Sequence, residues 1–221
     1  KEFAAYALER GVHFPQGHLW LTVDICAENQ AEVIDDLKRW LDLYLATGVK
    51  AGVLHPGGNQ MRRQQQSPAA VLDTQTQALG QLCTHLQGTD FTLCLENVPG
   101  TPEVEQLLSI IKAVDSPRLG ICLDTGHLNM AGGDQGHFLR QAGDRLKAMH
   151  LADNEGKTDQ HMMPFGRGNV DWSAVIGGLK ALRYEGLLNL EIPGESKAPL
   201  PVLLAKLDYL QVLMRYLVED A

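Results

Sequence analysis

Four apolar segments of the chain each end on a residue that could bind a metal ion or transfer a proton. The segment LCLE ends at Glu96, GICLD at Asp124, LKAMH at His150 and LLNLE at Glu191. Buried together, three carboxylates and an imidazole need a divalent cation to offset their repulsion and their loss of water. Oxygen ligands with one imidazole suit Mn²⁺, Mg²⁺, Co²⁺ or Zn²⁺. These four residues, called the quartet below, therefore predict a site for one divalent metal ion.

The spacing of the quartet supports this interpretation. A single carboxylate at the end of a strand is more often a helix cap or a loop anchor than a ligand. Here Glu96, Asp124 and His150 are each separated by the length of one strand and one helix, and the long loop DNEGKTDQHMMPFGRGNVDW follows soon after His150. Four such residues in successive units favour a shared site, and long loops of this kind are often functional.

Five polar residues near these strand ends are further candidates. His127 in LDTGHLN and His55 in VLHPGG are expected to line the pocket and bind substrate, and His127 could equally hydrogen-bond a ligating carboxylate. Asp159 and His161 form a DxH pair, which predicts either two ligands of an additional metal or polar groups that order the loop. Arg167, between two glycines in GRGN, suits a phosphate, carboxylate or polyol oxygen, unless it forms only a surface salt bridge.

Other polar and aromatic residues receive no chemical role. We expect Asp153 and Glu155 to be solvated and Trp172 to pack beneath the long loop. The remaining histidines lack a comparable position at a strand end, and we expect them at the surface or in structural positions: His13, His18, His85 and His137.

Helical patterns alternate with short apolar strands along the whole chain, as in folds built on a parallel sheet. Continuous apolar runs are typical of strands that are buried on both faces. The expected strands are residues 19–25, 49–55, 91–96, 120–124, 147–151 and 187–191. The expected helices are the end of one at 2–10, one from about 29 to 48, one opening at Ser67-Pro68, one opening at Thr101-Pro102 and one from about 201 to 218.

This order of elements predicts an α/β fold, the TIM (β/α)₈ barrel, in which the strand ends that carry the quartet share the catalytic rim. Such a barrel has eight strands and about 250 residues, so the six strands predicted here are too few. Because the chain opens inside a helix, we expect the first two strands to be missing at the N-terminus and to lie in an upstream segment of roughly 40 to 50 residues. Residues 1–221 are expected to form one domain, N-terminally incomplete.

Composition narrows the class of protein. The formal net charge of −8 argues against nucleic acid as a partner. The four cysteines form no CxxC pair, and Cys94 and Cys122 lie inside predicted core strands, which fits the reducing cytoplasm. No apolar run reaches the roughly 18 residues of a membrane span. We therefore expect a cytoplasmic protein with a small-molecule partner and no membrane, and a homo-oligomer is compatible with the sequence.

Several motifs together resemble the xylose isomerase-like TIM barrels, the superfamily of sugar phosphate isomerases and epimerases that also contains the endonuclease IV group. They are LENVPGT, ICLDTGHLN, the H…DxH…GRGNVDW run and NLEI. The resemblance to the ketose 3-epimerases implies that the quartet holds one divalent metal, typically Mn²⁺. It also implies that Glu96 and Glu191 exchange a proton on opposite faces of the substrate, and that His127 and Arg167 contact substrate oxygens.

The resemblance to endonuclease IV implies a three-zinc cluster. Eight of its ligands have matches in this chain: His55, Glu96, Asp124, His127, His150, Asp159, His161 and Glu191. The ninth, a histidine from the strand that precedes His55, has no counterpart in LWLTVDI, where Asp24 is the nearest polar residue. That absence, the acidic net charge and the PFGRGNVDW form of the loop favour the sugar enzymes.

The sequence thus predicts an enzyme of the isomerase class. Its expected reaction is metal-dependent isomerisation or epimerisation of a small sugar, sugar phosphate or hydroxy-keto acid, by proton transfer through an enediolate. A metal-dependent polyol dehydratase would use the same proton abstraction and expel a hydroxyl group. A zinc endonuclease that acts at abasic sites and a sugar-binding barrel without catalysis are also compatible with these residues.

Overall fold

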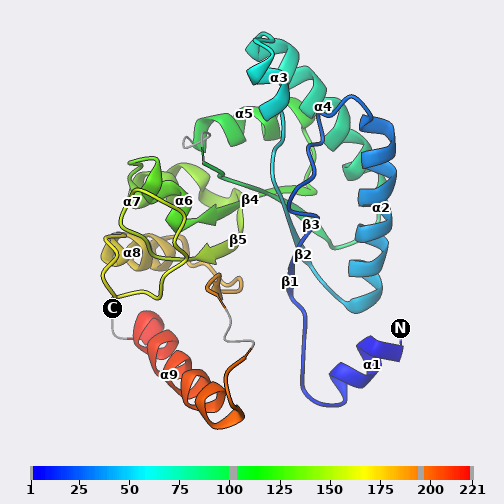
Figure 1. Cartoon of the computed structure of the whole chain (residues 1–221). Coiled ribbons are helices and arrows are strands. Elements are labelled where there is room, and N and C mark those ends of the chain that lie inside the picture. The colour runs from blue at the N-terminus through cyan, green and yellow to red at the C-terminus, as the bar shows by residue number, and fades with distance from the viewer. Residues whose placement is uncertain (1, 100–103, 194–196, 220–221) are drawn as a thin grey trace.

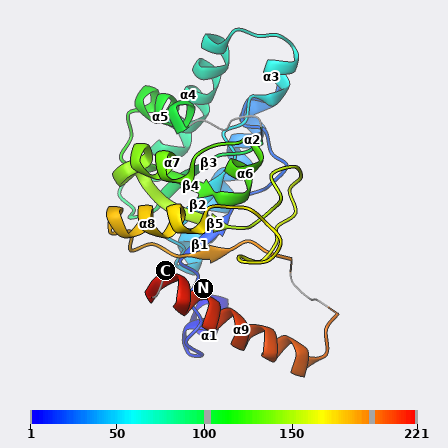
Figure 2. The same ribbon diagram turned by 90° about the vertical axis from the view of Figure 1, so that its left-hand side faces the viewer.

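Six parallel strands form one curled sheet whose outer face is covered by helices (Figure 1, Figure 2). The computed structural model describes residues 2–99, 104–193 and 197–219. Each strand pairs in parallel with the next one along the chain, in the order β1-β2-β3-β4-β5-β6. Strand β5 approaches β2 and β3 across the inside of the curl. The predicted TIM architecture is confirmed as a half-barrel that is open between β1 and β6.

The strands are β1 (Gln16–His18), β2 (Ala51–Leu54), β3 (Thr92–Glu96), β4 (Leu119–Asp124), β5 (Leu146–Leu151) and β6 (Asn189–Leu190). The helices are α1 (Glu2–Leu8), α2 (Gln30–Thr47), α3 (Asn59–Arg63), α4 (Pro68–His85), α5 (Val104–Val114), α6 (Thr125–Met130), α7 (Gln135–Ala142), α8 (Trp172–Leu182) and α9 (Leu200–Glu219), with a 3₁₀ turn η1 (Gly143–Arg145). Among the residues that the structure describes, no helix is both long and apolar enough to cross a membrane.

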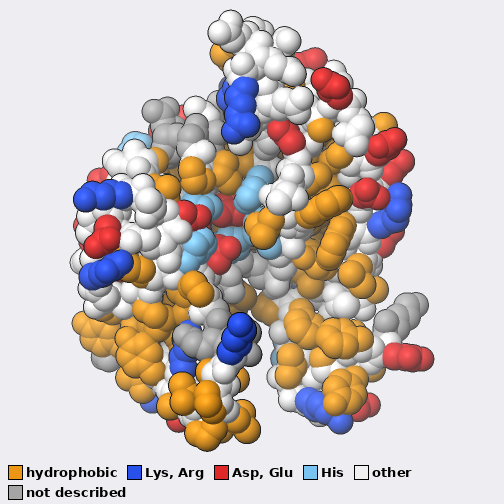
Figure 3. All heavy atoms as spheres, in the orientation of Figure 1, with side chains coloured by type: hydrophobic (Ala, Val, Ile, Leu, Met, Phe, Trp, Pro, Cys, Tyr) orange, Lys and Arg blue, Asp and Glu red, His pale blue; other side chains and the backbone are white. Residues whose placement is uncertain are grey.

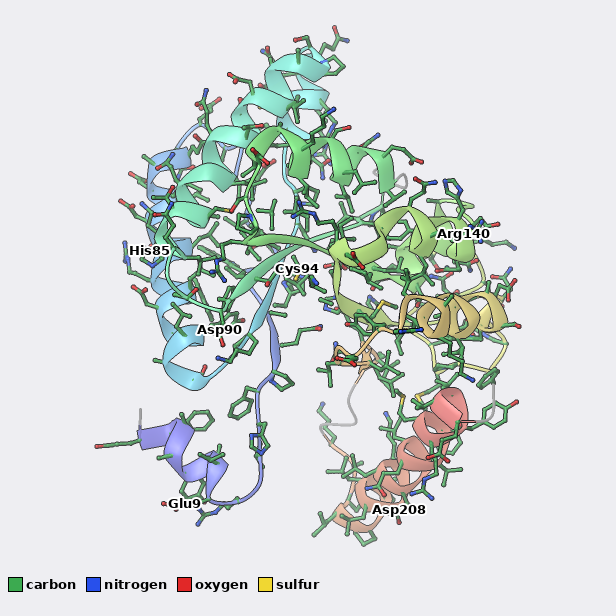
Figure 4. All side chains as sticks on the ribbon, turned by 180° about the vertical axis from the view of Figure 1, so that it is seen from behind. Glu9, His85, Asp90, Cys94, Arg140 and Asp208 are labelled. Carbon is green, nitrogen blue, oxygen red and sulfur yellow. The ribbon has the colours of Figure 1, made fainter. Side chains whose placement is uncertain are left out.

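Alternation along the strands decides which side chains face the inside of the curl. Side chains of successive strand residues point to opposite faces. Large apolar residues of β3 and β4, such as Leu95 and Ile121, pack against the helices outside. The opposite face carries a small separate cluster of Val53, Cys94, Cys122 and Ala148, and Figure 4 shows Cys94 at the centre of the molecule. The same two-residue period brings the last residues of these strands to the inner face.

The first strand is not where its sequence predicted it. The apolar run at 19–25 is not a strand: Trp20 and Leu21 are exposed and a turn follows them. The strand is the polar segment QGH, whose residues Gln16, Gly17 and His18 pair with residues 51–53 of β2. Gly17 faces Tyr44, so closely that a Cβ atom there would lie 2.8 Å from the tyrosine ring. Gln16 and His18 point inward, where polar partners replace apolar packing, and the apolar-run rule therefore misses this strand.

The helix boundaries largely follow the predicted signals. Helix α2 ends at Gly48, which adopts the left-handed conformation with φ 87°, and Ser67 caps α4 by accepting a hydrogen bond from the Ala70 N–H at 3.2 Å. The predicted start at Thr101-Pro102 lies outside the described residues. Helices α3, α6 and α7 were not predicted, and α3 lies in a stretch expected to be a polar loop. Helices α6 and α7 each begin after an aspartate in a D-x-G-H segment, and the carboxylate caps the N–H three residues later at 2.6 Å.

Candidate metal centre

The four strand-end residues of the quartet converge on the inner face of the sheet. One ligand atom from each of Glu96, Asp124, His150 and Glu191 lies within 4.8 Å of all the others. The first three side chains are almost completely buried, whereas that of Glu191 is 33% exposed. Figure 3 shows histidine and acidic side chains gathered in a hollow at the centre of this face. The prediction that the strand ends would bring these residues together is confirmed.

Unpartnered polar atoms in the quartet provide a direct test of whether a cation fits. Within the described part of the chain, Asp124 Oδ2, His150 Nδ1 and Glu191 Oε2 are buried and make no hydrogen bond. The last two atoms are only 2.7 Å apart, yet their geometry is not that of a hydrogen bond. Buried polar atoms without partners are costly and rare. A short contact of this kind is expected between two ligands of one ion, so the donor set fits a divalent metal.

Asp124 combines both roles that a strand-end carboxylate can have. Its Oδ1 accepts a hydrogen bond from the His127 N–H at 2.6 Å and so caps helix α6. Its second oxygen, Oδ2, is the unpartnered atom of the quartet. The cap fixes the carboxylate, because one oxygen is held by the helix while the other faces the cluster.

A second group lies beside the quartet and shares Glu96 with it. The Oε2 atom of Glu96 is 3.1 Å from His18 Nε2 and 3.5 Å from His55 Nε2. The two imidazole rings are nearly perpendicular, with centroids 5.0 Å apart. One ligand atom from each of the three residues lies within 4.8 Å of the others. The expectation that His18 is a surface or structural histidine is wrong, because β1 ends at this residue and points it into the curl.

A third group comes from helix α6 and the long loop after β5. Asp159 Oδ2 is 3.3 Å from His127 Nε2, and Asp159 Oδ1 is 3.1 Å from His161 Nε2. These three residues also have ligand atoms within 4.8 Å of one another. The structure thus places the DxH pair against His127 and leaves Asp159 partly open to solvent at the edge of the cluster.

Backbone carbonyls fix which nitrogen of three imidazoles is available for a metal. The Nδ1 atoms of His18, His127 and His161 lie 2.6, 3.0 and 2.7 Å from the carbonyl oxygens of Leu19, Asn97 and Glu191. A carbonyl only accepts hydrogen bonds, so Nδ1 carries the proton and the neutral ring keeps a lone pair on Nε2. In each ring this Nε2 faces a carboxylate oxygen. Metal-binding histidines are commonly oriented in this way.

The charges in this cluster compete for protons. Burial raises the pKa of Asp124 to about 7, although the neighbouring His127 opposes the shift. Burial would also raise the pKa of Glu96, but its contacts with the surrounding imidazoles, foremost those with His127 at 3.2 Å and His150 at 3.4 Å, hold it well below its usual range. Burial opposes protonation of His127, yet Glu96 and Asp124 raise its pKa to about 9. The cluster attracts positive charge, as protons or as cations.

The sequence as a whole matches one protein family. The profile of the xylose isomerase-like TIM barrel matches residues 1–213. The chain belongs to this family. Among structures that share its fold is a D-tagatose 3-epimerase-like protein, with 20% identity, a TM-score of 0.80, and coverage of 98% of this chain and 82% of that one.

Two curated relatives carry different activities in their names. A D-psicose 3-epimerase of Enterocloster bolteae is 28% identical over 87 residues, which are 39% of this chain and 27% of that protein. A probable endonuclease 4 of Mycoplasmoides gallisepticum is 31% identical over 175 residues, 71% of this chain and 50% of that protein. The chain spans half or less of the length of these relatives. The matches support an enzyme of the group that includes the sugar epimerases.

Within this family the structure changes one conclusion drawn from the sequence. The prediction that the strand before His55 supplies no histidine is wrong, since the strand is β1 rather than the run LWLTVDI, and β1 supplies His18. Asp24 instead accepts hydrogen bonds from the N–H groups of Cys26 and Gly58 and shapes the turn. His18 could have been recognised from its spacing, because it precedes His55 by about the length of one strand and one helix.

Other predicted positions have mixed outcomes. Arg167 is exposed, with Nε 3.7 Å from a Glu155 oxygen, and its contact with substrate stays a prediction. Trp172 is buried, as expected, whereas the expectation of a solvated Asp153 is wrong because this carboxylate is 1% exposed. The remaining histidines lie away from the cluster: His13 is exposed, His85 pairs with Asp42 on the outside of α4 (Figure 4), and His137 pairs with Glu105.

Proposed function

We propose that this chain is a divalent-metal-dependent isomerase or epimerase that acts on a small sugar, sugar phosphate or hydroxy-keto acid. The observation that carries the proposal is the quartet, which joins two glutamates to Asp124 and His150 around unpartnered buried atoms. The likeness to named sugar epimerases supports the same class of reaction. A metal-binding site alone would need no pair of acid/base groups.

In this mechanism the two glutamates differ in their surroundings. An ion held by the quartet, Mn²⁺, Mg²⁺, Co²⁺ or Zn²⁺, would polarise the substrate carbonyl and acidify the neighbouring C–H. Glu191, whose side chain is 33% exposed, is the better placed to take that proton. Glu96 is 1% exposed, and imidazoles surround both of its oxygens. Delivery of a second proton by Glu96, in its protonated form, to the opposite face of the same carbon inverts the stereocentre, and Glu191 then releases the abstracted proton to solvent. Delivery of a proton to the next carbon instead exchanges carbonyl and hydroxyl.

Solvent-deuterium exchange tests this proposal without knowledge of the substrate. The protein, with its metal content measured, is incubated in deuterated water with a panel of ketoses, sugar phosphates and keto-acids. We expect metal-dependent incorporation of deuterium at one carbon next to a carbonyl, and Glu191→Gln should slow it roughly 10²- to 10⁴-fold. Glu185→Gln, which changes an exposed glutamate a few residues earlier, is the matched control. A product that has lost water would instead identify a dehydratase, and unchanged exchange in Glu191→Gln would refute the assignment of the base.

A second function is favoured by the groups around His18 and Asp159. Together with the quartet, they form three metal-binding groups in one cluster, which also suits hydrolysis of a phosphodiester at an abasic site. Metal counting separates the two proposals, because the endonuclease requires three zinc ions and the isomerase requires one. Cleavage of a duplex that contains one abasic site, with no deuterium exchange on the sugar panel, would establish the second function.

A further inference from the structure

Three N–H donors hold the buried carboxylate of Asp153. Its Oδ1 accepts from the N–H groups of Asn154 at 2.9 Å and Val170 at 3.1 Å, and its Oδ2 accepts from Trp172 Nε1 at 3.0 Å. Within the described part of the chain, no lysine, arginine or histidine forms an ion pair with it. A charge buried in this way is kept only where its donors are well placed. The donors are all neutral N–H groups, so their positions matter more than any paired charge.

These hydrogen bonds join the two ends of the long loop. Asp153 follows strand β5, whereas Val170 and Trp172 stand at the start of α8. The Asp153 backbone also exchanges two hydrogen bonds with Met162, at 2.9 and 2.8 Å. Gly168 lies directly on the carboxylate, where an added Cβ would be 2.1 Å from Oδ1. One residue therefore closes the loop in two places, through its backbone and through its side chain.

The residues between these two closures include the DxH pair. The bridge between Asp153 and Met162 brackets the segment that carries Asp159 and His161, which we call the DxH arm (residues 154–161). The side chain of Asn154, fully buried, donates to the Gly126 carbonyl at 2.8 Å and so ties the start of the arm to helix α6, which carries His127. The position of the arm relative to His127 thus depends on the fold of the loop around Asp153.

We propose that Asp153 is a positioning residue that holds the DxH arm against His127. The positioning role itself is independent of the proposed function. Only the expectation that the DxH arm binds a metal ion rests on the metal-binding role proposed for the cluster. An aspartate is suited to this place because both oxygens receive N–H donors. An asparagine of the same size would replace one of the two oxygens by an NH₂ group. Whichever way its amide is turned, this group would face one of the N–H donors and lose that hydrogen bond.

The test compares Asp153→Asn with Asp171→Ala. Asp171 belongs to the same loop and caps α8 through the Ala174 N–H at 2.9 Å, so its hydrogen bond holds the helix rather than the DxH arm. Hydrogen–deuterium exchange of the metal-free proteins reports on the loop itself. We expect loop amides such as those of Met162 and Val170 to exchange roughly tenfold faster or more in Asp153→Asn. Asp171→Ala should leave them unchanged.

Zinc binding provides the second readout. Asp153→Asn should reduce the affinity of the DxH arm and His127 for one zinc ion by roughly 10- to 100-fold, the usual effect of removing a group that orients metal ligands. The ion of the quartet should stay bound. His161→Ala reports on the same site. If His161→Ala leaves the zinc content of the protein unchanged, the arm binds no metal and that role fails, while the exchange experiment still decides the role of Asp153. The proposal would be overturned if the loop amides of Asp153→Asn exchanged at the wild-type rate. It would also be overturned if the amides of β3 and β4 exchanged faster to the same degree as those of the loop.

Discussion

Replacement of His18 by alanine tests the part of the cluster that the sequence pattern did not reveal. His18 Nε2 lies 3.1 Å from the Glu96 oxygen that also faces His55, and its Nδ1 is engaged by a backbone carbonyl. If His18, His55 and Glu96 bind an ion, the alanine variant should hold one metal ion fewer per chain. The quartet should keep its own ion, because His18 is not among its members.

The size of the effect follows from the linkage between binding and stability. At a free metal concentration of about 100 times Kd, one occupied site stabilises the fold by about 2.7 kcal/mol. For a chain of this size each kcal/mol changes Tm by about 2 to 4 °C, so the loss of the site should reduce the metal-induced rise in Tm by about 5 to 11 °C. Each protein is compared with its own chelated form, so the contact between His18 and Glu96 in the metal-free state cancels from the difference.

The assay is elemental analysis of dialysed protein together with thermal unfolding, with and without a chelator. His13→Ala is the matched control, since His13 is an exposed histidine in the same segment. A variant His18→Ala that binds as much metal as wild type, with the same rise in Tm, would refute the assignment of His18 as a ligand.

Four further substitutions test the packing, the loop and a helix cap. Gly52→Ala would place a Cβ 2.5 Å from the Phe91 ring and should destabilise the fold by about 1 to 3 kcal/mol in denaturant titration, whereas Gly80→Ala, in open space on α4, should stabilise it by about 0.4 to 1 kcal/mol. Arg167→Gln should raise the KM for the substrate found in the exchange panel and change stability by less than about 0.5 kcal/mol, and an unchanged KM would remove Arg167 from the site. Ser67→Ala should cost about 1 kcal/mol of unfolding free energy because α4 loses its N-cap, which urea unfolding measures directly.

The quartet could be predicted because its signal is local. The runs that form β3 and β4 are buried on both faces, and the last residue of each marks the point where the strand leaves the core. The two-residue period of a strand then determines the face on which that residue lies. Glu96 and Asp124 end such strands, and their joint position on the inner face follows from the parallel pairing of β3 and β4.

The first strand and the loop depend on contacts that are distant in the chain. His18 stands in a polar segment that becomes a strand only because β2 pairs with it and because inward-facing polar groups, Glu96 among them, receive its side chain. The apolar run that follows it is a better local match for a strand, yet its Trp20 and Leu21 remain at the surface. A local sequence pattern contains no information about pairing partners that lie far away in the chain and become neighbours only in the folded protein.

By itself the sequence determined the alternating architecture, five of the six strands and the convergence of the quartet, since these depend on periodicity and on strand ends. Only the tertiary structure decided that His18 joins His55 at Glu96 and that Asp153 is buried. It also placed Asp159 of the DxH pair against His127, a contact that the spacing of these residues does not predict. The reason is physical: a ligand group is a matter of a few ångströms between side chains from different strands and loops, and that proximity arises from the packing of the whole sheet.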